Sequence, residues 1–335
     1  MITMIKYVTI AILLLIAELV YFQIAKRFNI KDMPTYRSSH SRVVISGGGI
    51  IFTIAAWVWV AFFGIHHAWF LLALTMIAGV SFLDDMNALP DSVRLMIHFV
   101  AMLLMLHNMD MVHLHLWWVV LLALIVCVGA MNIYNFMDGI NGMLAGYSLA
   151  VLVPLLLVNL RGEEEFVETS FIIVTIISTL IFSFFNFRPK GKAWCFAGDV
   201  GSLGMAFIVL FFIGRLAMAT SDVSWLVFLI VYGVDGCCTI VHRIMLHENL
   251  GEAHRKHAYQ IMANELKMGH VEVSLIYAGL QLVISLVMVY LIPDTVLAHW
   301  IYLVAVGAVL VAAYVLFMKK YYHLHEEYLM SLAEK

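Results

Sequence analysis

The stretch MIKYVTIAILLLIAELVYFQIA, residues 4–25, is predominantly apolar and decides the class of this protein. A helix needs roughly 20 such residues to cross the hydrocarbon core of a bilayer. No small-residue cleavage site precedes Lys26-Arg27, so we expect the segment to be retained as a membrane helix rather than removed as a signal peptide.

The rest of the chain has the same character. Its 335 residues are 64% hydrophobic and 12% charged, whereas soluble domains average about 25% charged residues. So few charges cannot cover a globular surface, and a net charge of −3 gives no bulk positive charge for nucleic acid. We predict an all-α polytopic membrane protein with about eleven spans. They lie near residues 4–25, 46–65, 68–84, 94–109, 116–133, 142–160, 169–186, 200–219, 224–244, 272–292 and 299–318.

The basic residues predict how the chain is oriented. The loops and flanks after odd-numbered spans hold 16 of the 19 Lys and Arg residues. The other side has only Lys6 and Arg161, and Arg215 lies within the eighth span. Positive charge marks the cytoplasmic side, so we expect the N-terminus outside and the C-terminus in the cytoplasm. Residues 1–335 then form a single membrane domain, with cytoplasmic loops near 26–46, 84–93, 134–142, 187–199 and 245–271.

Two adjacent carboxylates, Asp84 and Asp85, close the third predicted span. Like charges at a membrane boundary repel each other and are costly to desolvate. A divalent cation or a cationic partner would relieve that cost. The alternative is a solvated helix end beside the Pro90 turn.

A polar cluster follows the fifth span. Asn135, Asp138 and Asn141 are spaced by three residues, so on one helical turn they would share a face. Gly139 and Gly142 would allow a ligand to approach the backbone closely. Such a face suits hydrogen bonding to a nucleotide or sugar, although Asn, Asp and Gly also favour a capped turn.

Asp199 precedes the eighth span, within Gly198-Asp-Val-Gly-Ser202. It is placed to act as a helix N-cap, as a ligand to a hard metal, or as both. Mg²⁺ prefers one or two carboxylates together with phosphate oxygens. The cations just upstream could face phosphate or simply follow the positive-inside rule; they are Arg188, Lys190 and Lys192.

The long loop after the ninth span contains His254-Arg255-Lys256-His257. Arg255 and the two imidazoles offer donors for phosphate oxygens, and the alternative is a solvated basic loop.

In the first loop, Arg37, His40 and Arg42 could form an anion site. The three glycines at 47–49 allow a tight turn or close helix packing. All of these clusters fall on the predicted cytoplasmic face, which favours a hard cation, a phosphate-rich substrate and a nucleotide or sugar at the lipid interface.

The ordered motifs resemble the polyprenyl-phosphate N-acetylhexosamine-1-phosphate transferase superfamily, glycosyltransferase family 4. They are RSSH (37–40) with GGG (47–49), FLDD (82–85), NFMDGINGM (135–143), FAGDVGS (196–202) and HRKHAYQ (254–260). The HRxH pattern resembles the branch that initiates O-antigen and capsule synthesis. Two features depart from the family pattern: the first loop lacks prolines before its glycines, and Asn141 stands where many members have Asp.

The resemblance implies a reaction in which a UDP-N-acetylhexosamine, GlcNAc-type, and undecaprenyl phosphate give undecaprenyl-diphosphate-sugar and UMP. It implies that Asp199 binds Mg²⁺, or alternatively Mn²⁺, and that Asp84 orients the lipid phosphate or acts as a base. Asp85 would support the metal and phosphate region. The lipid phosphate would attack the donor directly, and the alternative is a phospho-enzyme through Asp84 or Asp85. The remaining site residues would bind substrate, with Asn135, Asp138 and Asn141 on the nucleotide side and His254, Arg255 and His257 at the diphosphate or sugar.

The resemblance also implies a bacterial inner membrane as the location, with a homodimer as a candidate assembly. Two other function classes remain at this stage. A secondary transporter would place its ionisable residues near mid-span, and an intramembrane aspartyl protease would pair Asp84 with Asp199.

Overall fold

A computed structural model describes residues 2–35, 38–86, 89–112, 115, 117–162, 164–252 and 254–333. The long helices follow the predicted apolar segments. They are α1 (Ile2–Phe28), α2 (Ile50–Phe63), α3 (Ala68–Met86), α4 (Asp91–Asn108), α5 (Trp117–Phe136), α6 (Met143–Arg161), α7 (Thr169–Asn186), α8 (Gly198–Thr220), α9 (Ile230–Met245), α11 (His270–Tyr290) and α12 (Val296–Ala333).

The all-α membrane class is confirmed. Within the described ranges, nine helical segments are long and apolar enough to cross a membrane, one of them joining the 3₁₀ helix η2 (Val223–Leu229) to α9. Helix α2 and the apolar part of α4 are shorter. The count of eleven spans and the orientation therefore stay predictions.

Three elements were not expected. A two-stranded antiparallel ribbon pairs β1 (Lys31–Asp32) with β2 (Val44–Ile45) inside the first predicted loop. A short helix, α10 (Ala258–Asn264), lies inside the last predicted loop. Helix α12 runs to Ala333, well past the predicted end at 318, because the polar residues after Lys319 continue the helix outside the apolar segment.

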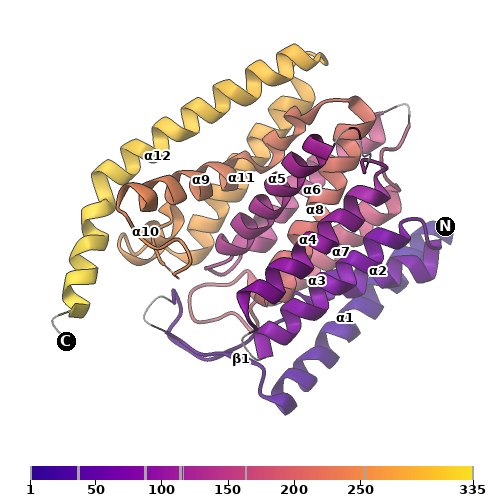
Figure 1. The fold of residues 1–335 in the computed structure, drawn as a ribbon. Coiled ribbons are helices and arrows are strands. Elements are labelled where there is room, and N and C mark those ends of the chain that lie inside the picture. Colours follow the sequence, from indigo (N-terminus) through magenta and orange to yellow (C-terminus); the bar gives the residue numbers. More distant parts are fainter. Residues whose placement is uncertain are drawn as a thin grey trace.

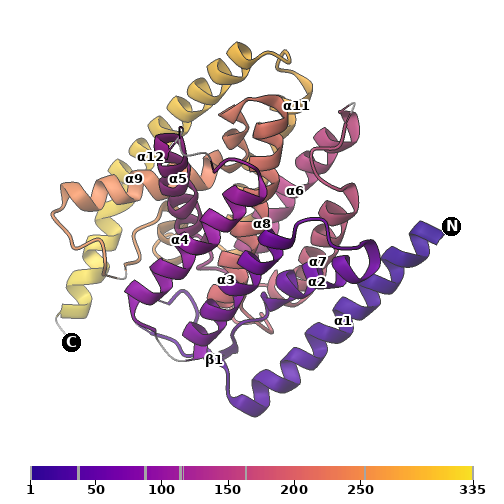
Figure 2. The same cartoon turned by 45° about the vertical axis from the view of Figure 1, so that its right-hand side comes forward.

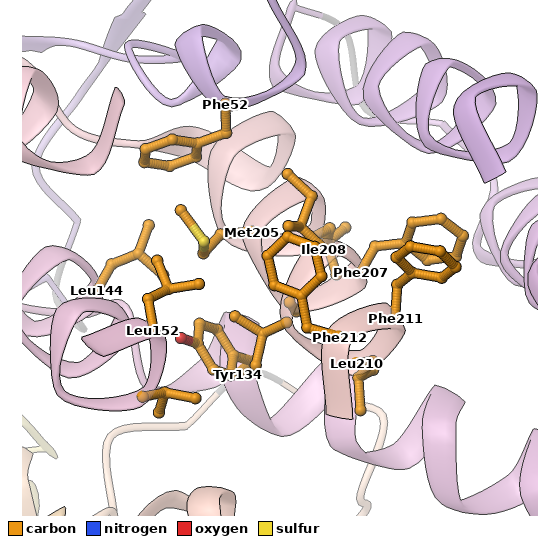
Figure 3. Packing of buried hydrophobic residues seen from close by; sticks show 14 of the residues in the cluster. Phe52, Tyr134, Leu144, Leu152, Met205, Phe207, Ile208, Leu210, Phe211 and Phe212 are labelled. Carbon is orange, nitrogen blue, oxygen red and sulfur yellow. The ribbon is translucent and has the colours of Figure 1, made fainter. Parts of the chain in front are cut away.

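Helix α8 is the centre of the bundle. Every residue from Val200 to Ile213 is buried, and α8 contacts α2, α3, α5, α6 and η2. A helix that is apolar on all sides belongs in the interior. Figure 3 shows its Phe207, Phe211 and Phe212 at the core of the packed cluster, where the ring of Phe211 stacks on that of Phe70 with centroids 4.1 Å apart.

Helices α1 and α12 lie at opposite edges of the bundle in both views (Figures 1 and 2). Only 33% of the most apolar stretch of α1, and 11% of that of α12, is buried inside the protein. Their exposed apolar side chains are suited to contact lipid.

Candidate functional site

The helix ends and loops enclose a polar cavity of about 910 Å³ at one end of the bundle. Residues from all five predicted cytoplasmic loops line it. The predicted site residues among its lining are Asp84, Asp85, Asn135, Asp138, Asn141, Asp199, His254 and His257. The packing of the helices thus brings these eight residues into one cavity, whereas Arg255 does not line it.

The N-terminus of α8 is capped from another helix. The Asp85 carboxylate accepts hydrogen bonds from the backbone N–H groups of Asp199, at 3.0 Å, and Val200, at 3.2 Å. Asp199 itself lies in the first turn of α8, so its prediction as the N-cap is wrong. The negative charge of Asp85 also complements the positive end of the helix dipole.

Gly198 makes this arrangement possible. Its φ is +69°, and a Cβ there would lie 2.5 Å from Asp85 Oδ2. Any other residue would push Asp85 away from the end of α8.

The other carboxylate of the pair, Asp84, faces Arg94. Its Oδ1 accepts the backbone N–H of Leu89 at 2.7 Å, and its Oδ2 pairs with the Arg94 guanidinium. Arg94 Nη1 is also 3.9 Å from Asp199 Oδ2. The guanidinium therefore lies between two carboxylates, and both oxygens of Asp84 are engaged.

Asp199 is oriented by the end of α5. Asn135 Nδ2 lies 2.9 Å from Asp199 Oδ1 and 2.8 Å from Ser202 Oγ. The Asp199 side chain is 36% exposed, against 9% for Asp84. Asp199 is thus the carboxylate of the group that a ligand in the cavity can reach most directly.

The polar cluster after α5 is not one continuous helix. Helix α5 ends at Phe136, so Asp138 and Asn141 lie in the turn that leads into α6. The prediction that they share a helical face with Asn135 is therefore wrong, although all three line the cavity. Burial raises the pKa of the Asp138 carboxyl well above its usual range, and the nearby Asp199 and Asp85 carboxylates add to this.

Asn141 holds a neighbouring loop. Its side chain is buried, and Nδ2 donates to the carbonyl oxygens of Arg188, at 2.9 Å, and Pro189, at 3.1 Å. This loop connects α7 to α8, so Asn141 helps to fix the approach to Asp199.

Both glycines of this turn lie close to other parts of the protein, and Gly139 also lines the cavity, so close approach of a ligand to its backbone stays a prediction. A Cβ on Gly139 would lie 2.2 Å from the Tyr259 hydroxyl, and one on Gly142 would lie 1.5 Å from the Phe187 ring. The hydroxyl of Tyr259 donates to the Phe136 carbonyl at 2.8 Å, which joins the end of α5 to α10.

The side chains of residues 254–257, here called the HRKH loop, lie in two different surroundings. His254 and His257 line the cavity with ring centroids 5.1 Å apart. Burial lowers the pKa of His254 to about 3, and His257 contributes to this. His254 is therefore a neutral imidazole at neutral pH. Its Nδ1 accepts the backbone N–H of Lys256 at 3.4 Å, so Nε2 carries the ring hydrogen and is the donor left for a ligand.

Arg255 points away from the cavity. Its Nη2 is 2.6 Å from Glu265 Oε1, and its guanidinium stacks 4.1 Å over the ring of Tyr328 on α12. The predicted contact of Arg255 with substrate is not supported by this geometry, because a buried carboxylate and an aromatic ring already hold the side chain.

The first loop packs closely against α8. A Cβ on Gly49 would lie 2.2 Å from the Cα of Gly201, so the prediction of close helix packing at the glycines is confirmed. His40 lines the cavity, whereas Arg42 is exposed outside it. Arg37, the third member of the predicted anion site, lies outside the described residues.

Comparison with known proteins agrees with this geometry. Residues 67–234, about half of the chain, match glycosyl transferase family 4. The chain belongs to this family. The matched range contains the acidic pair, the Asn135 to Asn141 cluster and Asp199, and it ends before the HRKH loop. The predicted family resemblance is confirmed.

Individual relatives have related names. A Bacillus subtilis protein named a probable undecaprenyl-phosphate N-acetylglucosaminyl 1-phosphate transferase is 28% identical over 280 residues, 76% of this chain and 77% of its own. Phospho-N-acetylmuramoyl-pentapeptide-transferases match over shorter stretches. The Oceanobacillus iheyensis protein is 32% identical over 27% of this chain and 26% of its own, and the Deinococcus radiodurans protein is 38% identical over 23% and 20%.

The donor set of this family member partly fits a hard metal ion. Within the described ranges, no three His, Cys, Asp or Glu side chains are grouped closely enough to hold a metal by themselves. Asp199 offers a reachable carboxylate on the cavity. Mg²⁺ is commonly bound by one or two carboxylates plus substrate phosphates, so the residues fit an ion that substrate oxygens help to hold.

The sequence does not single out Arg94, which lines the cavity, or Asp235, which lies behind it. Arg94 was counted only as one of the basic residues that set the orientation, and Asp235 was counted only as part of an apolar span. Asp235 is 3% exposed and contacts His257. A lone acidic residue inside an apolar segment is the signal that could have drawn attention to it.

Proposed function

We propose that this protein transfers N-acetylhexosamine-1-phosphate from a UDP-sugar, of the GlcNAc type, to undecaprenyl phosphate and releases UMP. The observation that supports this most directly is the Asp84–Arg94–Asp199 arrangement at the cavity end of α3, α4 and α8. The name of the B. subtilis relative supports the lipid acceptor and the GlcNAc donor.

The reaction needs positioning and charge neutralisation more than covalent chemistry. Mg²⁺ would be held by Asp199 and by oxygens of the donor diphosphate, and would neutralise charge there. Asn135 keeps the Asp199 carboxylate turned towards the cavity, and Arg94 offers positive charge beside it. The polar lining on the Asp138 and Asn141 side is suited to the nucleotide.

Direct attack by the lipid phosphate is the route that the hydrogen bonds favour. Asp84 accepts from Leu89 and Arg94, and both oxygens of Asp85 accept backbone N–H groups. A carboxylate with both oxygens engaged is a poor nucleophile. We propose that Asp84 and Asp85 orient Arg94 and α8 for the expected direct attack, rather than acting as a base or forming the alternative phospho-enzyme.

The site would work at the cytoplasmic face of a bacterial inner membrane, at the start of a cell-surface glycan such as O-antigen or capsule. At that interface a water-soluble donor can meet a phosphate carried by a lipid. No feature of the described structure favours the transporter or the protease.

The test is nucleotide release by the purified protein in detergent, with undecaprenyl phosphate, Mg²⁺ and a panel of UDP-sugars. We expect UMP release that depends on the lipid and is fastest with UDP-GlcNAc. Release of UDP would mean simple glycosyl transfer and would contradict the proposal.

The same assay with a donor labelled at the β-phosphate tests the route. Direct attack places all the label in lipid. Label that stays on denatured protein after a single turnover without acceptor would establish the phospho-enzyme instead.

A further inference from the structure

Asp235 is a buried carboxylate on α9 that faces the HRKH loop. It is 3% exposed and accepts hydrogen bonds from five donors. They are His257 Nδ1 at 3.2 Å, the backbone N–H groups of Ala258 at 3.1 Å and Tyr259 at 3.4 Å, the Tyr277 hydroxyl at 2.6 Å and the Thr239 hydroxyl at 3.1 Å. A buried carboxylate is costly unless it is fully paired, and this one is.

These contacts fix the backbone around His257. Two of the donors are the first N–H groups of α10, so Asp235 caps that helix from α9. The N–H of His257 also donates to Gln260 Oε1 at 3.2 Å. The Cα of His257 is thereby held by both α9 and α10.

The same carboxylate orients the imidazole. Because Asp235 acts as an acceptor towards backbone N–H groups, it also accepts from Nδ1, which therefore carries the ring hydrogen. The other nitrogen, Nε2, is buried and has no hydrogen-bond partner in the described part of the structure. His257 lines the cavity, so Nε2 is the ring nitrogen left for a ligand there.

We infer that Asp235 is a positioning residue for the reaction, which acts through His257. It holds the imidazole in the tautomer that leaves Nε2 as a hydrogen-bond acceptor for a hydroxyl group of the donor. That the sugar donor binds next to Nε2 of His257 rests on the proposed function. Asp235 does not line the cavity itself, so its effect on turnover passes through His257.

The chain contains a natural control for this arrangement. Asp222 is also a buried aspartate that binds a histidine, with His299 Nδ1 2.7 Å away, and its side chain caps η2 by accepting from the Ser224 N–H at 2.9 Å. This pair lies beyond the far end of α8, away from the cavity. Asp222→Asn removes a comparable buried pair without touching the site.

The experiment compares Asp235→Asn, His257→Gln, the double variant and Asp222→Asn. UMP release gives kcat and KM for each, and thermal unfolding in detergent gives stability. We expect Asp235→Asn to lower kcat on the order of 10- to 100-fold, the size seen when a partner that orients a histidine is lost. We expect Asp222→Asn to reduce stability and leave kcat unchanged.

The double variant separates positioning from general destabilisation. If Asp235 acts through His257, the double variant loses no more activity than the more affected single variant. Losses that multiply would overturn the inference, as would a fall in kcat for Asp222→Asn as large as that for Asp235→Asn.

A second measurement does not depend on activity or on the folding of any Asp235 variant. Nitrogen NMR of ¹⁵N-histidine-labelled wild-type protein reports the tautomer of each ring, with His257 assigned by the signals lost in His257→Gln. We expect His257 with its hydrogen on Nδ1. Hydrogen on Nε2, or rapid exchange between the two, would overturn the inference. Absence of UMP release by the wild type would count against the proposed function alone, and the NMR result would still decide the tautomer.

Discussion

Four of the carboxylates that line the cavity have different surroundings at the scale of single residues. Asp85 is engaged by the end of α8 and Asp84 by Arg94, whereas Asp138 is half-buried in a turn. Asp199 is more exposed than Asp84 and is oriented by Asn135. Residues of the same type thus have different partners within one cavity, and only Asp199 is proposed to bind the metal.

Asp199 gives the first prediction. Asp199→Asn removes the charge that the metal requires but keeps the shape, so we expect activity at low Mg²⁺ to fall on the order of 100-fold or more. Raising Mg²⁺ should recover part of the loss. The measurement is UMP release as a function of Mg²⁺.

The matched control is Asp110→Asn. Asp110 is exposed just beyond the far end of α4, with a φ of +57° that Asn tolerates well. We expect it to behave as wild type. Near-normal activity of Asp199→Asn at low Mg²⁺ would contradict the metal assignment.

At the scale of elements, the site depends on how closely α8 packs against the first loop. The backbones of Gly49 and Gly201 touch, and this contact places the N-terminus of α8 over Asp85. Small residues at helix contacts allow such close approach in membrane proteins.

Gly201→Ala tests this packing. Its Cβ would lie 2.5 Å from the Gly49 Cα and 2.8 Å from the Ala197 Cβ, so α8 would have to shift. We expect a loss of about 1–3 kcal/mol of stability, as for other overpacked contacts, together with a loss of activity. Thermal unfolding and UMP release measure the two effects.

Gly204→Ala is the control on the same helix. There the nearest atom to the new Cβ is Thr53 Oγ1 at 3.5 Å, an ordinary contact. Equal effects of the two substitutions would show that helix propensity, and not the Gly49 contact, sets the stability.

The extension of α12 beyond the apolar segment is the second element of interest. It packs against the HRKH loop and α10, where His325 Nδ1 lies 3.1 Å from Glu265 Oε1, the oxygen that also binds Arg255. His325 is buried and His323, on the same helix, is exposed.

His325→Ala should loosen this contact. Loss of one partner of a buried hydrogen bond costs about 1–3 kcal/mol, so we expect lower thermal stability and faster proteolysis of the loop at 246–257. His323→Ala should change neither. His325→Asn keeps a donor near the position of Nδ1, so recovery of stability in this variant would support the hydrogen bond as the cause. If the loop of His325→Ala were cut no faster than that of the wild type, the hydrogen bond would be refuted as the cause.

At the scale of the whole molecule, the helix ends that line the cavity come together at one end of the bundle. The side chains there are polar, while α1 and α12 expose apolar surface along the length of the bundle. This division fits a protein whose reacting groups meet at a membrane interface.

The orientation of the bundle gives the last prediction. The positive-inside rule predicts that the cavity and the C-terminus face the cytoplasm. Fusions after residues 192 and 333 should be active with a reporter that works in the cytoplasm and inactive with one that works in the periplasm. A fusion after residue 164 should be active only with the periplasmic reporter. A periplasmic signal at 192 would invert the topology and remove access to a cytoplasmic donor.

The sequence by itself determined the membrane class, the apolar segments and the motifs that carry the family resemblance. These are local properties, because hydropathy and motif spacing depend on residues close together in the chain. It also predicted eight of the side chains that line the cavity. It also predicted a loop at 134–142, and the break after Phe136 falls within it. The shared helical face of Asn135, Asp138 and Asn141 was wrong, because the spacing of polar residues is compatible with both a helix and a turn.

Only the tertiary structure decided which partner each of these side chains has. Asp85 caps α8 through the N–H of Asp199, 114 residues later in the chain, Arg255 faces α12 and Asp235 contacts His257. Such contacts depend on which helices pack together and at what rotation, and that is set by interdigitation of side chains over the whole core. Residue spacing in the sequence does not determine this packing, so the contacts of Arg94 and Asp235 could be identified only in the folded protein.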